Sequence, residues 1–190
     1  MKILAIAVLS IFIFSFYEQD QPNQILWSKK HLKWRDFKGT PDSTGPHAKA
    51  AAVTSSRLEQ RYYKTANNEI HFIIAAWFNP ARSWVKESTL KSNGSDRTLD
   101  HEQHHFDMCE LYARKIRKYL STAVFTDSTY RQKIPELFKT FHKEYRTEQE
   151  RYDSEVKVTR QSLDDWTSSI DDEMKQLSKF SDTLVVVKLQ

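Results

Sequence analysis

The sequence holds one cysteine, three glycines and no block of like charge, and each scarcity excludes a class of protein. With Cys109 alone, neither an intramolecular disulfide nor a cysteine-rich zinc knuckle can form, so we expect this thiol to pack as a small core residue. Three glycines supply neither a phosphate-cradling loop nor a nucleophile elbow. Nucleotide and serine chemistry are therefore disfavoured.

Charges of both signs are interleaved along the 190 residues, and the formal net charge is only +4. A nucleic-acid-binding surface concentrates Lys and Arg on one face. The one basic cluster, Arg114, Lys115, Arg117 and Lys118, is predicted to be the solvated side of a helix. We therefore expect no nucleic-acid partner.

The sequence also lacks an apolar run long enough for a comfortable membrane span, which needs about 20 residues. Met1 and Lys2 precede apolar residues from Ile3 to Tyr17, and a polar stretch begins at Glu18. A short basic start and a short apolar centre are typical of a secretory signal, although no small-x-small pair marks a cleavage site. Residues 1–20 are predicted to be a signal peptide or an uncleaved N-terminal anchor. The protein is expected to be exported, periplasmic or secreted, with membrane contact only through such an anchor.

With 39% hydrophobic and 28% charged residues, the chain is expected to fold as one globular domain over residues 21–190. The first half favours strands. Trp27 and Trp34 lie among polar residues in a short predicted strand or strand pair over 25–37, and 38–47 reads as a loop. Asn67 and Asn68 suggest a turn before a strong strand, whose apolar face is Ile70, Phe72, Ile74, Ala76 and Phe78.

The second half favours helices. Ser95 or Asp96 can cap a helix that runs to about Leu120, with an apolar stripe of Phe106, Cys109, Ala113, Ile116 and Leu120. A second long helix is predicted to begin near Pro135, a third to span about 163–180, and a last strand to cover 184–187. Antiparallel strands followed by three helices indicate an α+β fold.

The stretch from His101 to His105 carries the chemistry. Residues four apart lie on one helix face, so His101 and His105 can hold one zinc ion. Glu102 lies about 100° round the helix, close enough to act as the catalytic base on a zinc-bound water. The pattern therefore predicts a Zn²⁺ hydrolase, and a peptide or protein is the expected substrate. The strand over 70–78 is expected to lie beside this helix and to pair with an extended substrate backbone.

A catalytic zinc site needs a third protein ligand. Met108 and Leu111 stand where an extended motif of one large peptidase group has Gly and His, so that group is excluded. The helix after Pro135 offers two flanks to the metal. One flank holds His142, Gln149 and Asp153, and the other holds Glu144, Glu148 and Glu155. Spacing alone does not choose between them. Tyr152 or His142 could stabilise the oxyanion.

Several motifs together resemble a family of bacterial predicted secreted zinc-dependent proteases, catalogued mainly as a domain of unknown function. They are Leu32-x-Trp34-x-Asp36-Phe37-x-Gly39-x-Pro41-Asp42, Phe78-x-Pro80-x-x-Ser83-Trp84, Leu99-x-His101-Glu102-Gln103-x-His105-Phe106-Asp107, Glu110-Leu111-Tyr112-Ala113-Arg114 and Gln149-x-x-Tyr152-Asp153-x-Glu155, with Trp166 beyond. The resemblance implies a zincin-like exported hydrolase with His101 and His105 as zinc ligands and Glu102 as base.

One departure from the family pattern concerns the third ligand. Where the family has Thr-x-His after Tyr-Asp-x-Glu, this chain has Val156 and Val158. Asp153 or Glu155 is then the candidate ligand in place of that histidine. Two further hypotheses remain open: a catalytically inactive, exported, zincin-like binding domain, and a metal hydrolase that acts on an ester or amide outside peptides.

Overall fold

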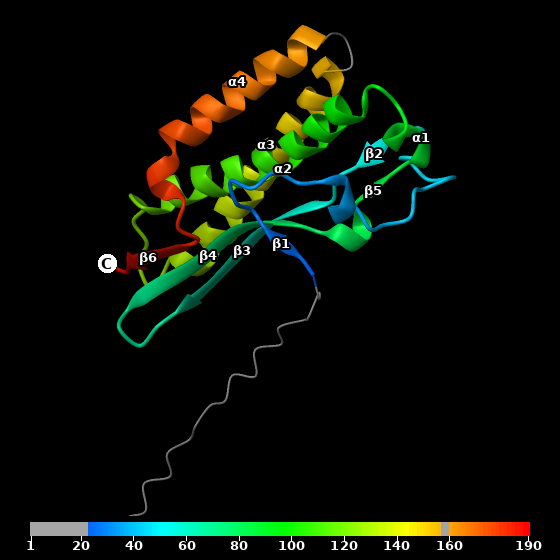
Figure 1. The fold of residues 1–190 in the computed structure, drawn as a ribbon. Coiled ribbons are helices and arrows are strands. Elements are labelled where there is room, and N and C mark those ends of the chain that lie inside the picture. The colour runs from blue at the N-terminus through cyan, green and yellow to red at the C-terminus, as the bar shows by residue number, and fades with distance from the viewer. Residues whose placement is uncertain (1–22, 157–159) are drawn as a thin grey trace, which may run out of the picture.

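The computed structural model describes residues 23–156 and 160–190. The predicted signal or anchor over residues 1–20 and the Val158 departure lie outside these ranges. The described chain is an α+β structure in which an antiparallel sheet is covered on one face by long helices, as Figure 1 shows. Among the described residues, no helix is both long and apolar enough to cross a membrane.

Strand β4 (Glu69–Phe78) is the centre of the main sheet. It forms a hairpin with β3 (Ser56–Lys64) through the turn that the pair Asn67 and Asn68 predicted, and Asn68 adopts a positive φ of 59° in this turn. The other edge of β4 is occupied by β1 (Ile25–Leu26) at one end and by β6 (Leu184–Lys188) at the other. Both edges of β4 are therefore filled, so the expectation that it pairs with a substrate backbone is wrong.

A second, two-stranded sheet lies beyond one end of the first (Figure 1). It pairs β2 (Ala52–Val53) with β5 (Trp84–Val85), and the short helix α1 (Glu87–Leu90) follows. Ser83, which is fully buried, joins the residue before β5 to the segment after β2, because its hydroxyl accepts from the backbone N–H of Ser55 at 2.9 Å.

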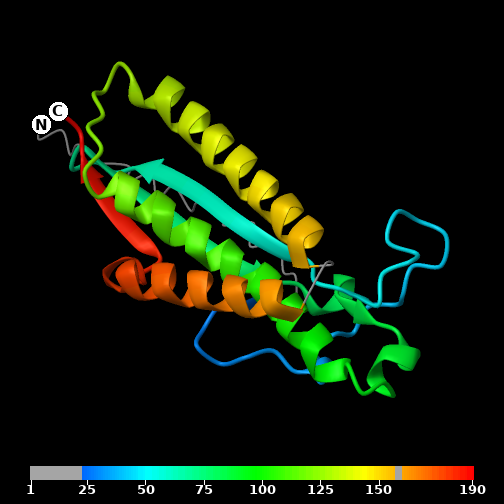
Figure 2. The ribbon, with the colours of Figure 1, turned by 90° about the horizontal axis from the view of Figure 1, so that it is seen from above.

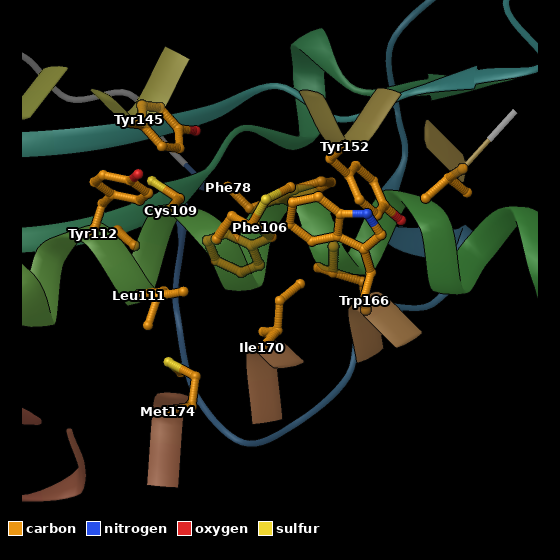
Figure 3. Close-up of a cluster of buried hydrophobic side chains, with 14 of the residues drawn as sticks. Phe78, Phe106, Cys109, Leu111, Tyr112, Tyr145, Tyr152, Trp166, Ile170 and Met174 are labelled. Carbon is orange, nitrogen blue, oxygen red and sulfur yellow. The ribbon is translucent and has the colours of Figure 1, made fainter. Parts of the chain in front are cut away.

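Three long helices cover the sheet: α2 (Ser95–Leu120), α3 (Tyr130–Val156) and α4 (Arg160–Gln176). Figure 2 shows α2 lying between the other two. The predicted stripes are buried, since all five stripe residues of α2 and all five residues of the β4 face are at most 2% exposed. Figure 3 shows one of the two core clusters, where Phe78 of the sheet meets Phe106 of α2, Tyr152 of α3 and Trp166 of α4.

Three predicted boundaries differ from the structure, and one of them is the helix expected over about 163–180, which is α4 followed by a 3₁₀ turn over Ser178–Phe180. Only Ile25–Leu26 of the expected strand region is a strand, and a 3₁₀ turn covers Trp34–Asp36. The segment after β1 is held by side chains of α2 and not by the backbone hydrogen bonds of a β-ladder. Trp27 donates to Asp107 at 2.7 Å, and Gln103 Oε1 accepts from the Leu32 N–H at 2.8 Å. Helix α3 begins at Tyr130, before Pro135, because Thr126 and Thr129 initiate it.

The prediction that the basic cluster of α2 is solvated is wrong for its two arginines, whereas Lys118 is exposed and Lys115 is half-buried. Arg114 and Arg117 are buried at 5% and 1% exposure, and both donate to the Glu110 carboxylate. Arg117 also donates to the carbonyls of Ile74 and Phe180. Buried guanidinium groups persist only where they are paired and hydrogen-bonded, and here they fasten α2 to the sheet and to the segment after α4.

Candidate metal centre

The pocket at the N-terminal half of α2 has a volume of about 790 Å³. One wall is the segment Ala50–Thr54, which includes β2, and the facing wall comes from the C-terminal end of α3. His101, Glu102, His105 and Asp153 line it together. A hydrogen bond fastens the Ala50–Thr54 wall to α2, because Thr54 Oγ1 donates to the backbone carbonyl of Glu102 at 3.0 Å.

Three potential ligand atoms converge in this pocket. His101 Nε2 and His105 Nε2 lie 3.2 Å apart, and Asp153 Oδ1 lies 3.3 Å and 3.2 Å from them. Zinc binds such atoms at about 2.0–2.2 Å, so tetrahedral ligands lie about 3.3–3.6 Å apart. The observed triangle therefore matches one face of a zinc tetrahedron, and these are the described residues whose donor atoms fit a metal ion.

The charges of the triangle support one another. Burial would raise the pKa of Asp153, but hydrogen bonds and charge from His101 and His105 outweigh it and hold that pKa well below its usual range. Burial would likewise lower the pKa of His105, but the Asp153 hydrogen bond and the charge of Glu102 outweigh it and raise that pKa. The carboxylate is thus ionised and ready to accept a cation.

Glu102 is the fourth functional group of the pocket. It is 4% exposed, and within residues 23–156 and 160–190 its Oε2 atom has no hydrogen-bond partner. Burying a carboxylate oxygen without a partner is costly, so such an atom at a pocket wall suits a group that accepts a proton from a bound molecule. The base role of Glu102 stays a prediction.

Tyr152 lies behind the imidazoles rather than among the pocket-lining residues. Its ring, fully buried, stacks on His101 with centroids 4.8 Å apart and meets the edge of His105. Its hydroxyl donates to the His101 carbonyl and lies 3.2 Å from His104 Nδ1. This placement suits a residue that positions the ligands and does not match the predicted oxyanion role, which needs a hydroxyl that faces the substrate.

His104 was assigned no role from the sequence, yet it joins three helices. It is 7% exposed, with Nδ1 against Tyr152 of α3 and Nε2 3.2 Å from Thr167 Oγ1 of α4. Burial and the neighbouring His101 lower the pKa of His104 to about 4, so this ring is neutral at pH 7. A histidine beside the ligand pair was indistinguishable in sequence from a surface residue.

Gln149 is a second residue whose role the sequence did not reveal. Its side chain contacts both the Nδ1 atom and the backbone carbonyl of His105. It lies on the same flank of α3 as Asp153, and this flank is the one that faces the pocket.

Other predicted site residues lie elsewhere. The Glu155 carboxylate accepts from Trp166 Nε1 at 2.9 Å, outside the histidine–Asp153 triangle, so the structure does not bring it forward as a ligand. His142 is exposed and contacts Tyr145. Val156, the described part of the departure from the family pattern, lines the pocket as a buried apolar residue.

A family model described as "Bacterial protein of unknown function (DUF922)" matches residues 36–161. The chain belongs to this family. The DUF922 match spans α2 with the histidine pair and α3 with Asp153, so the whole triangle lies inside the family's segment. The family description names no activity. No curated protein and no solved structure matches the chain.

Proposed function

We propose that this chain is an exported, zincin-like, zinc-dependent peptidase whose metal is held by His101, His105 and Asp153. The observation that carries the proposal is the triangle of ligand atoms 3.2–3.3 Å apart beside the unpartnered Glu102 oxygen. Export rests on the apolar run that follows Lys2. A bound zinc ion supplies a Lewis acid that lowers the pKa of water and polarises a carbonyl group.

Glu102 is the general base in this proposal. As the oxygen of a water molecule bonds to the carbonyl carbon of a peptide, Glu102 accepts a proton from that water. When the carbon–nitrogen bond then breaks, Glu102 returns the proton to the leaving amine, so that water has been added and the carboxylate is restored. The buried position of Glu102 keeps it free of competing solvent.

The wall opposite the helix supports a peptide as substrate. Strand β2 pairs with β5 along one edge, and no other strand of the described chain pairs with it. The segment Ala50–Thr54 lines the pocket along the histidine pair. An extended backbone can therefore hydrogen-bond to this strand, which takes the role that we had predicted for β4.

The first test is zinc content by elemental analysis of the purified chain and of a His101→Ala variant. The proposal predicts about one zinc per chain, lost in the variant. The second test exposes a peptide library to the chain and detects products by mass spectrometry. Glu102→Gln is expected to keep the zinc and lose the products, whereas Glu150→Gln, an exposed position on α3, should keep both.

The alternative is a non-catalytic exported binding domain with the same fold. Valine at positions 156 and 158, where the resemblance described in the sequence analysis leads us to expect Thr-x-His, favours it. Under this alternative the wild-type chain binds zinc but yields no cleavage product from any library. Products that persist unchanged in the Glu102→Gln variant would instead rule out the mechanism given above.

A further inference from the structure

Gln149 holds His105 at two points, and the two contacts have different chemical requirements. The amide nitrogen, Nε2, donates to the backbone carbonyl oxygen of His105 at 3.0 Å. The amide oxygen, Oε1, contacts Nδ1 of the same residue's ring. His105 and Gln149 come from different helices, so this pair of contacts also crosses from α3 to α2.

The carbonyl contact fixes the orientation of the amide. A backbone carbonyl oxygen can only accept a hydrogen bond, so the amide must present its NH₂ group there. The amide oxygen then faces the ring, and an amide oxygen can also only accept. Nδ1 of His105 must therefore carry the proton, which leaves the lone pair of the neutral ring on Nε2.

We propose that Gln149 is a positioning residue that holds His105 in the Nδ1–H tautomer and so directs the Nε2 lone pair towards His101 and Asp153. This need is specific to the site, because Asp153 Oδ1 lies only 3.2 Å from His105 Nε2. Without an acceptor at Nδ1, the neutral ring would donate from Nε2 to this carboxylate. That proton would occupy the position through which the ring binds a metal.

The link to zinc rests on the proposed function, whereas the tautomer does not. Ring N–H groups of metal-bound histidines are commonly oriented by such partners, and losing a partner costs about 10–100-fold in metal affinity. We expect a loss of this size for Gln149→Leu, which removes the acceptor. Gln149→Glu keeps an acceptor at Nδ1 and should retain the tautomer, although it gives up the bond to the carbonyl.

The test reads the tautomer directly in the metal-free protein. Two-bond ¹⁵N–¹H spectra of the imidazoles, at a pH at which His105 is neutral, report which nitrogen carries the proton, and a His105→Asn variant assigns the signals. The wild type and Gln149→Glu should show Nδ1–H, and Gln149→Leu should show Nε2–H. Gln132→Leu, an exposed glutamine on the same helix, serves as the matched control and should behave as wild type.

An unchanged Nδ1–H signal in Gln149→Leu would overturn the inference. Loss of the signal in both Gln149 variants would also overturn it, because the effect would then come from packing and not from the acceptor. Zinc titration of the same proteins separates the two proposals. If the wild type shows the Nδ1–H tautomer but binds no zinc, the proposed function fails while the role of Gln149 in the tautomer stands.

Discussion

The phenol ring of Tyr152 stacks on the imidazole of His101, with centroids 4.8 Å apart and planes inclined by 24°. Because Tyr152 immediately precedes Asp153, this stack sets the position of the α3 carboxylate against the α2 histidines. The candidate metal centre is therefore assembled at a helix–helix contact. Its geometry depends on how α2 and α3 pack and not on the His-Glu-x-x-His segment alone.

Among the residues of α3, Asp153 is expected to contribute most to zinc affinity. Changing Asp153 to Asn removes the anionic ligand oxygen, and zinc binding should weaken by more than the roughly 10–100-fold that indirect changes cost. Glu155→Gln is the matched control, since this carboxylate bonds to Trp166 and should leave zinc affinity within a few-fold of wild type. Competition titration with a chromophoric chelator measures both. Equal losses in the two variants would contradict the assignment of Asp153.

Tyr152→Phe separates positioning from oxyanion stabilisation. The variant keeps the ring stack but leaves the His101 carbonyl and His104 without the hydroxyl, so unfolding should become easier by about 1–3 kcal/mol. Loss of an oxyanion donor would lower kcat about 100–1,000-fold. We expect a much smaller fall in kcat, because the hydroxyl is directed at the protein. Denaturant unfolding measures the loss of stability, and steady-state kinetics on an identified substrate measure the change in kcat.

Local sequence pattern was sufficient to predict α2, which carries the histidine pair, and the central strand β4. The period of the α2 stripe and the alternation along β4 each predicted an apolar face that the structure buries. The two histidines one turn apart needed only helix geometry. The choice of Asp153 over Glu155 could not be made this way, because it depends on which flank of α3 faces α2. That orientation comes from the long-range packing of Tyr152 and Trp166.

The other wrong predictions concern charged and indole side chains. Arginine is usually a surface residue, but Arg117 is only 1% exposed, and its guanidinium donors are satisfied by Glu110 and two backbone carbonyls. Trp27 was predicted to be part of a strand, yet its indole N–H donates a hydrogen bond to Asp107, 80 residues further along the chain. Such partners are set by tertiary structure, and no local period reports them.

Cys109 should be inert in the folded protein. It is 0% exposed, and burial raises the pKa of its thiol to about 12, whereas an unfolded cysteine ionises near about 8.5. At pH 9 the thiol is thus protonated in the native state and mostly ionised after unfolding. A disulfide reagent should therefore modify one thiol per chain in denaturant and almost none without it. Equally fast modification in both conditions would contradict the buried position.

The Glu110 cluster should contribute more to stability than any surface pair. Glu110→Gln removes the charge that compensates Arg114 and Arg117, whose side chains are 6% and 1% exposed, and breaking a buried pair costs about 3–5 kcal/mol. Glu87→Gln is the control, because Glu87 pairs with Lys91 at an exposed position where such contacts contribute about 0–1 kcal/mol. Urea unfolding of both variants measures the difference.

Because Arg117 also binds the carbonyls of Ile74 and Phe180, the Glu110 variant should lose amide exchange protection first in β6 and the segment after α4, while the His101–His105 turn keeps its protection. Uniform loss across α2 would mean that the cluster supports the helix itself and not the docking of the C-terminal elements.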